Sequence, residues 1–292
     1  MGTFAGAWTA LVTPFREDVV DEEALRGLVE AQIRGGIDGL MPCGTTGESV
    51  NLSHAEFVKV VQITVDQARG RVPVVAGSGT ASTRHAIELS RAASDAGAAG
   101  LLVVAPYYNR PTQEGLYEHF IAIAGAVDLP IVLYNIPART GVDVSLATLE
   151  RLAAVPSIVA IKESTGNVAR SADIAAHFGE RFVILSGDDA LTLPIMAVGG
   201  HGVVSVAANL VPADVARVVD LFREGDLAGA RAQAQRLRPL YEALFIESSP
   251  GPIKFALAAC GRIKPEIRLP MVPPTDASQA HIRAVMKQLG IS

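Results

Sequence analysis

Short apolar runs alternate with longer amphipathic stretches along most of the chain, and this alternation limits the possible folds more than any other feature. The runs recur roughly every 25 to 35 residues, the length of one strand-plus-helix unit. They predict strands at residues 8–12, 39–42, 72–76, 100–104, 131–134, 158–162, 182–185 and 203–206. Strict alternation favours a parallel sheet, and eight strands are enough to close a barrel. The predicted fold is therefore a (βα)₈ TIM barrel of the α/β class.

An open doubly wound sheet is the competing architecture. It usually carries a glycine fingerprint after its first strand, and Thr13-Pro14-Phe15 is not one. Beyond residue 206 the alternation stops, and the pattern predicts helices at about 212–224, 226–245 and 251–260. We expect a barrel over residues 1–210 and a C-terminal helical extension over 211–292, packed on the barrel as one structural unit.

Composition narrows the functional classes. The chain has 292 residues, 49% of them apolar, and a net charge of −5 without a basic cluster, so nothing indicates nucleic-acid binding. Two cysteines, Cys43 and Cys260, are too few for a disulfide framework, and the six histidines form no metal-binding pattern. We therefore expect no metal and no cofactor. Residues 1–15 lack the pattern of a secretory signal and no apolar stretch is long enough to span a bilayer, which predicts a soluble cytoplasmic protein.

Polar and reactive side chains follow several of the predicted strands. In a barrel of this type function collects at the carboxyl ends of the strands. The segments in question are 44–48, 106–111, 134–140, 162–164 and 186–188. The sequence therefore predicts a polar site at one end of the barrel.

Lys162 is the most informative of these residues because it is the only one of five lysines that closes an apolar strand. Pointing into the barrel mouth, its amine would be partly desolvated, which favours the neutral form that attacks a ketone. The alternative is a structural lysine paired with Glu163 or Asp188. Tyr134 ends the preceding strand, and matching strand ends would bring its hydroxyl and the amine into one pocket as a proton shuttle. Taken alone, Tyr134 is equally an interior aromatic residue whose hydroxyl is satisfied locally.

Two further segments could hold carboxylates. Thr45 and Thr46, between two glycines, offer hydroxyls and backbone N–H groups in a tight turn, although such threonines also bond their own backbone. The guanidinium of Arg139 suits a second carboxylate, although a loop arginine is often only a surface charge. Glycines near the last two strands, among them Gly187, could suggest a phosphate site, but the loop at 207–210 has no Lys or Arg.

Together these motifs resemble the dihydrodipicolinate synthase family of pyruvate-dependent Schiff-base aldolases, over nearly the whole chain. The resemblance rests on residues 44–49 (GTTGES), 106–112 (PYYNRPT), 134–137 (YNIP), 139–141 (RTG), 161–163 (IKE) and 268–271 (RLPM). It implies a lyase in which pyruvate condenses on Lys162. The resulting enamine attacks the aldehyde of aspartate semialdehyde, and cyclisation releases hydroxy-tetrahydrodipicolinate for diaminopimelate and lysine biosynthesis.

The resemblance also implies roles for individual residues. Tyr134, Thr45 and Tyr108 would form a proton relay, with Tyr108 reaching into the site of a neighbouring subunit. Thr46 and the backbone of Val204 would hold pyruvate, and Arg139 would hold the carboxylate of the semialdehyde. We also assign Gly187 to substrate binding. The implied assembly is a homotetramer built from tight dimers.

Four alternatives remain at this stage. Sialic acid lyases resemble the chain but typically carry Ser-Thr at the place of Thr45-Thr46 and lack the Arg-Thr-Gly segment that includes Arg139. Hydroxy-oxoglutarate aldolases usually lack that arginine. A non-enzymatic binding barrel would tolerate Lys162→Arg, whereas an imine-forming enzyme would not, because a guanidinium stays protonated. A phosphosugar barrel enzyme would bind phosphate and ignore pyruvate.

The chain departs from the family pattern at two places. Residues 248–252 (SSPGP) replace the more usual Asn-Pro-x-Pro, and we expect them to lie away from the site. Phe57, Ala81 and His85 stand where lysine-inhibited members carry polar and acidic residues. They are poor acceptors for a lysine ammonium, so feedback by lysine should be weak or absent despite Ser49, His54 and Tyr107.

Overall fold

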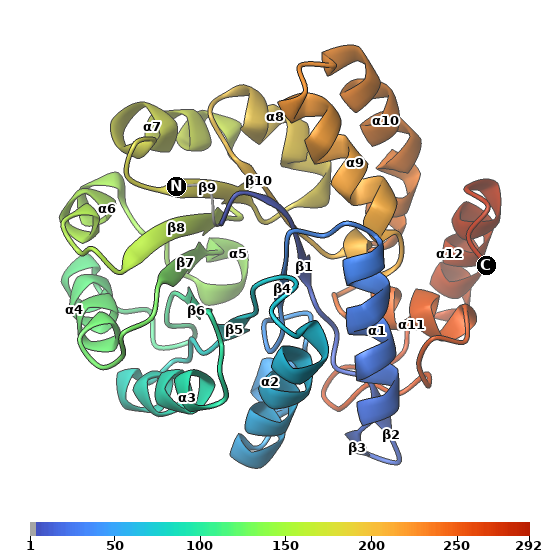
Figure 1. Ribbon diagram of the computed structural model, residues 1–292, viewed down its shortest axis with the longest axis horizontal. Coiled ribbons are helices and arrows are strands. Elements are labelled where there is room, and N and C mark those ends of the chain that lie inside the picture. The colour runs from blue at the N-terminus through green and yellow to red at the C-terminus, as the bar shows by residue number, and fades with distance from the viewer. Residues whose placement is uncertain (1–3) are drawn as a thin grey trace.

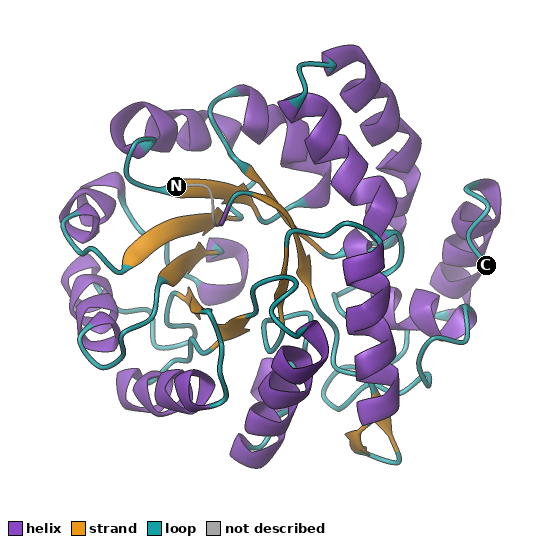
Figure 2. Ribbon diagram, viewed as in Figure 1, coloured by secondary structure: helices purple, strands orange, loops and turns teal. Residues whose placement is uncertain are grey.

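The computed structural model describes residues 4–292, and its eight parallel strands form the wall of a barrel (Figures 1 and 2). The strands are β1 (Gly6–Ala10), β4 (Gly39–Met41), β5 (Val75–Gly77), β6 (Gly100–Val104), β7 (Ile131–Asn135), β8 (Ile158–Glu163), β9 (Val183–Ser186) and β10 (Gly202–Ser205). Their order is β4-β1-β10-β9-β8-β7-β6-β5. The two ends of this order meet where Leu40 pairs with Val74 and where Gly77 N–H donates to the Pro42 carbonyl at 2.9 Å. The sheet thus closes on itself, and the predicted TIM barrel is confirmed.

Helices surround the strands in a ring (Figure 2). They are α1 (Glu22–Arg34), α2 (His54–Ala68), α3 (Thr83–Asp95), α4 (Gln113–Ala124), α6 (Leu146–Ala153), α7 (Val168–Phe178), α8 (Thr192–Ala197) and α9 (Pro212–Arg223). α9 contacts β1, β10 and α1, so it closes the ring between the last and first units. None of the described helices is long and apolar enough to cross a membrane.

Three more helices follow the ring: α10 (Leu227–Ala243), α11 (Gly251–Ala259) and α12 (Asp276–Gln288). α10 packs on α9, and α12 packs on both α10 and α11. Figure 1 shows α11 and α12 on the outside of the barrel, next to α1. The polar tail beyond residue 260 therefore contains a helix that the sequence pattern did not predict.

Local chemistry explains where the elements begin and end. Ser53 caps α2, and the predicted capping box is confirmed, because the Ser53 hydroxyl accepts from Glu56 N–H while the Glu56 carboxylate accepts from Ser53 N–H. β5 starts at Val75, later than predicted, after Pro73, which has no N–H for a ladder. β1 ends at Ala10, earlier than predicted, and the N–H of Val12 donates to the Asn209 side chain at 3.0 Å.

Several short elements were not predicted. They are the two-stranded ribbon of β2 (Phe15–Arg16) and β3 (Val19–Val20), the single-turn helix α5 (Pro137–Thr140), and the 3₁₀ turns η2 (Ser49–Asn51), η3 (Asp189–Leu191) and η4 (Ala207–Asn209). α5, η2 and η3 follow β7, β4 and β9 at the carboxyl ends of these strands. They therefore help to shape the end of the barrel where the polar segments gather.

Candidate active site

Lys162 and Tyr134 lie side by side at the ends of two neighbouring strands. They are register partners across β8 and β7. The Lys162 Nζ atom is 4.0 Å from the centroid of the Tyr134 ring, and both residues are at least 94% buried. Because side chains alternate along a strand, Lys162 shares a face of β8 with Ile158 and Ala160, which are fully buried. Lys162 and Tyr134 therefore meet as neighbours, with the amine against the aromatic ring.

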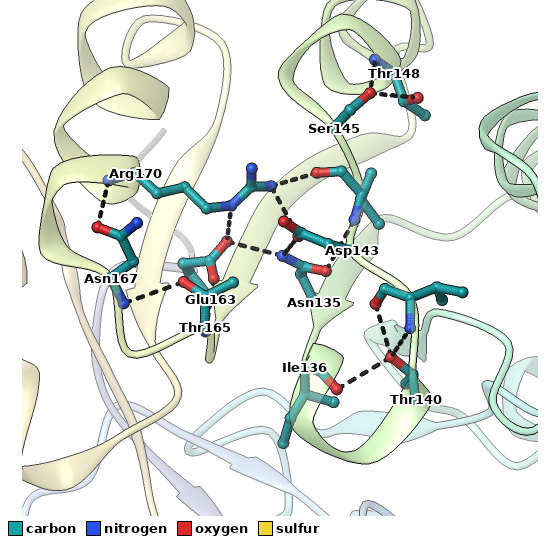
Figure 3. A network of polar contacts seen from close by, with 12 residues as sticks. Asn135, Ile136, Thr140, Asp143, Ser145, Thr148, Glu163, Thr165, Asn167 and Arg170 are labelled. Carbon is teal, nitrogen blue, oxygen red and sulfur yellow. Dashed lines mark hydrogen bonds and ion pairs between the residues drawn. The ribbon is translucent and has the colours of Figure 1, made fainter. Parts of the chain in front are cut away.

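Lys162 has no carboxylate partner among residues 4–292, because the two candidate acids are engaged elsewhere. The Glu163 carboxylate accepts from Arg170 at 3.2 Å, from the Asn135 amide at 3.2 Å and from Thr165 N–H at 2.8 Å. Figure 3 shows Arg170 extended between Glu163 and Asp143. Asp188 instead accepts from Ala190 N–H as the cap of η3. The alternative of a structural lysine paired with either acid is therefore wrong.

A cavity of about 330 Å³ opens beside Tyr134. Its lining comes from the ends of several strands and the loops that follow them. Four residues predicted from the sequence contribute to the cavity wall: Thr45, Tyr108, Tyr134 and Arg139. Cys43 also lines it, and burial raises the pKa of the Cys43 thiol, which keeps this side chain protonated.

Arg139 is positioned by α5, which begins at Pro137 immediately after β7. Its Nη2 donates to the carbonyl of Ser249 at 3.3 Å. The expectation that residues 248–252 lie away from the site is therefore wrong. This segment, next to the start of α11, reaches the cavity wall and fixes the arginine there.

The remaining predicted residues divide into two groups. Gly187 lies next to Lys162, because a Cβ atom added to the glycine would lie 3.0 Å from Lys162 Cε. Thr46 is buried beside Thr45, and Val204 is buried on β10 opposite Trp8. Neither Thr46 nor Val204 is among the residues that line the cavity wall.

Sequence reasoning missed a buried ion pair behind the threonine turn. Lys254 of α11 donates to Glu48 Oε1, and the backbone N–H of Arg268 donates to Glu48 Oε2 at 3.0 Å. Burial lowers the pKa of Lys254, and the Glu48 carboxylate works against this by favouring the ammonium. The two residues are 206 positions apart, so no local pattern could have paired them.

The fold and the site together define a class: a TIM barrel with a buried lysine and a cavity at the carboxyl ends of its strands. The model of the dihydrodipicolinate synthetase family matches residues 3–289. The chain is 54% identical to the 4-hydroxy-tetrahydrodipicolinate synthase of Sorangium cellulosum, over 98% of this chain and 96% of that one. It therefore belongs to the dihydrodipicolinate synthetase family and is a lyase of the class I aldolase type.

Solved structures agree with this assignment. The crystal structure of dihydrodipicolinate synthase from Aquifex aeolicus is 45% identical, with a TM-score of 0.97 over 99% of both chains. A dihydrodipicolinate synthase variant described as monomeric is 39% identical, also with a TM-score of 0.97, over 99% of this chain and 98% of that one. The sialic acid lyase and hydroxy-oxoglutarate aldolase alternatives are not favoured by these comparisons.

Proposed function

We propose that the protein condenses pyruvate with L-aspartate 4-semialdehyde through a Schiff base on Lys162, giving 4-hydroxy-tetrahydrodipicolinate. The observation that carries the proposal is the state of Lys162: a buried amine at the mouth of the barrel, packed on the Tyr134 ring and not paired with an acid. Names shared by relatives that match over almost the whole chain support the choice of substrates.

The reaction follows from amine chemistry. Lys162 Nζ adds to C2 of pyruvate, and loss of one water gives the imine, which loses a C3 proton to become an enamine. The enamine carbon attacks the aldehyde carbon of the semialdehyde, whose oxygen takes up a proton. The amino group of the substrate then attacks C2, closes the ring and releases the lysine as a free amine.

We assign the proton transfers to Tyr134, Thr45 and Tyr108. Tyr134 contacts the amine directly, and all three residues line the same cavity. Arg139 lies on the cavity wall, where its guanidinium suits the carboxylate of the semialdehyde.

Pyruvate binding is assigned to three other residues. Thr46 follows Thr45 in the same turn, and the backbone of Val204 lies on β10. A Cβ atom added to Gly187 would lie 3.0 Å from the methylene next to the amine. We expect a higher KM for pyruvate when the Thr46 hydroxyl is removed or when Gly187 or Val204 is replaced by a larger residue.

The test of the function is a coupled assay. Enzyme, pyruvate and aspartate semialdehyde are mixed, and cyclic product is followed through a reductase that consumes NADPH. Lys162→Ala should abolish turnover, while Lys59→Ala, which changes an exposed lysine on α2, should leave it intact. No turnover in the wild type, together with borohydride-trapped pyruvate on Lys162, would contradict the semialdehyde assignment and preserve the imine.

We further propose that the enzyme is a homo-oligomer, a dimer of dimers in which Tyr108 is shared. Tyr108 is 92% exposed although it lines the cavity, and its φ of 72° is unusual for a bulky residue. Both facts fit a side chain held by a second subunit. Light scattering after size exclusion should give the mass of a tetramer, whereas a monomer that retains full turnover would contradict the sharing of Tyr108.

We place the enzyme in the cytoplasm. Cys43 and Cys260 are both free thiols, which suits a reducing compartment. Cell fractionation with an antibody against the chain should find it with cytoplasmic markers.

A further inference from the structure

Ser164 follows Lys162 by two residues and continues the strand geometry of β8. Its N–H donates to the Asn135 carbonyl at 2.9 Å, and Gly187 N–H donates to the Glu163 carbonyl at 2.8 Å. The backbone hydrogen bonds that join β8 to β7 and to β9 therefore continue past the last residue of β8. Since side chains alternate along an extended chain, Ser164 and Lys162 point to the same face.

The Ser164 Oγ atom is buried and has no hydrogen-bond partner among residues 4–292. Leaving a buried hydroxyl unsatisfied costs on the order of 1–3 kcal/mol, so such a group calls for an explanation. The side chains of Glu163 and Asn135 bond to each other and to Arg170, Asp143 and Thr165, not to the Ser164 hydroxyl.

Gly187 keeps this hydroxyl beside the lysine. A Cβ atom at residue 187 would lie 1.8 Å from Ser164 Oγ and 3.0 Å from Lys162 Cε. The same small volume is therefore bordered by the serine hydroxyl and by the last methylene of the lysine. Tyr134 lies on the β7 side of the amine, while Gly187 follows β9 on the other side. Ser164 thus offers a second hydroxyl, from a different direction than the phenol.

We propose that Ser164 is a further catalytic residue, whose hydroxyl donates a hydrogen bond to the oxygen derived from the pyruvate ketone while the imine forms on Lys162. This inference rests on the function proposed above. When Nζ bonds to C2, the C=O π bond breaks, the oxygen takes up a proton to become a hydroxyl, and Nζ, cationic after the addition, gives up one proton. When C=N forms, that hydroxyl leaves as water after a second protonation. Ser164 stabilises the negative charge that develops on this oxygen while Nζ bonds to C2, and it has no net gain or loss of a proton.

The assignment also explains why residue 187 is a glycine. The backbone does not require a glycine at residue 187, because its φ angle is not positive. Any side chain at this position would instead collide with the serine hydroxyl. The absence of a side chain at Gly187 therefore leaves room for the Ser164 hydroxyl beside Lys162.

The experiment measures imine formation separately from the complete reaction. Enzyme is mixed with saturating pyruvate and quenched with borohydride at timed intervals, and the mass of the Lys162 peptide reports the trapped adduct. Ser164→Ala should slow the approach to full trapping about 10- to 100-fold, the effect of losing one hydrogen bond to a charged oxygen. Saturation with pyruvate separates this loss from weaker binding.

Ser171 provides a matched control. It lies on α7, is 1% exposed, and its Oγ is also buried without a partner among the described residues. Ser171→Ala should trap pyruvate at the wild-type rate. Ser164→Thr, which keeps the hydroxyl, should recover most of the rate lost in Ser164→Ala, even if either variant is less stable to heat.

Three results would overturn the inference. They are wild-type trapping in Ser164→Ala, equal slowing in Ser164→Ala and Ser171→Ala, and a Thr variant as slow as the Ala variant. If the wild type itself does not trap pyruvate on Lys162, the proposed function fails and the role of Ser164 fails with it. Normal trapping in both the wild type and Ser164→Ala removes only the role of Ser164.

Discussion

At the scale of single residues, the site depends on which charges are paired and which are not. Glu163 follows Lys162 directly, yet its side chain turns to Arg170 and Asn135, and this leaves the amine beside the phenol. Glu48 follows the threonine turn and is held by Lys254 from α11. In both cases a cation from another element neutralises the buried carboxylate: Arg170 lies seven residues after Glu163, and Lys254 lies 206 residues after Glu48.

The pair of Lys254 and Glu48 leads to a stability prediction. Both side chains are at most 3% exposed, so Lys254→Met would leave a buried carboxylate without its cation. We expect a loss of about 3–5 kcal/mol in the free energy of unfolding, measured by urea denaturation. The exposed pair of Arg238 and Glu242 on α10 is the control, because Arg238→Met should cost less than about 1 kcal/mol. Similar losses in the two variants would contradict the importance of burial.

At the scale of elements, the helices are positioned by contacts that their own sequences only partly reveal. The amphipathic stripes of α1, α2 and α4 and the capping box of α2 could be recognised locally. α12 also has an apolar stripe, Ile282, Val285 and Met286, and a Thr275 cap, but polar residues dominate it and its partners α10 and α11 lie far away in the chain. α5 is one turn long, too short for a periodic pattern, although it places Arg139.

The contact between α3 and α4 should make stability depend on pH. His119 on α4 is buried, its Nδ1 is 2.9 Å from the Thr83 hydroxyl of α3, and burial lowers its pKa to about 4. Because the folded state favours the neutral ring, the unfolded chain binds more protons between pH 6.5 and 4. The contribution of His119 to the free energy of unfolding is complete above pH 6.5. It is lost as the pH falls through this range, by up to about 3 kcal/mol.

The measurement is urea denaturation of the wild type and of His119→Gln at several pH values in this window. The variant should lose this part of the pH dependence. His177→Gln, which replaces an exposed histidine on α7, should behave like the wild type. If the wild type and His119→Gln keep a constant difference from pH 7 to pH 4, the buried imidazole is not the cause.

At the scale of the whole molecule, the barrel and the helices after residue 210 are tied together. α9 covers β1 and β10, and α11 supplies Lys254 to Glu48 near the barrel mouth. We propose that residues 1–210 and 211–292 form one structural unit. Thermal unfolding should therefore show a single cooperative transition with fluorescence and circular dichroism coinciding, and two separated transitions would contradict this.

Sensitivity to inhibition by lysine also depends on residues that come from separate elements of the fold. Phe57 is buried, and the His85 ring contacts Glu88 at 3.2 Å. The side chains of Phe57, Ala81 and His85 therefore offer no strong hydrogen-bond acceptor to a lysine ammonium. We expect the coupled assay to keep most of its rate when lysine is added, and half-inhibition by sub-millimolar lysine would overturn the prediction.

The sequence by itself determined the fold class and most of the candidate site. Alternating apolar runs set the strands and amphipathic helices, and parallel strands bring their carboxyl ends to one edge, so Lys162, Tyr134, Thr45 and Arg139 could be grouped before any coordinates were known. These inferences depend only on local periodicity and on the geometry of one repeated unit.

Tertiary structure alone decided which charges meet. The partners of Glu48 and Arg139 lie 206 and 110 positions away, in segments whose placement no local pattern encodes. The closeness of Ser164, Gly187 and Lys162 depends on how β8 and β9 align. Electrostatic and steric contacts act over a few ångströms in space, whatever the distance along the chain. The lysine that we propose as the nucleophile can therefore be found in the sequence, while the reason that it has no acid partner is visible only in the fold.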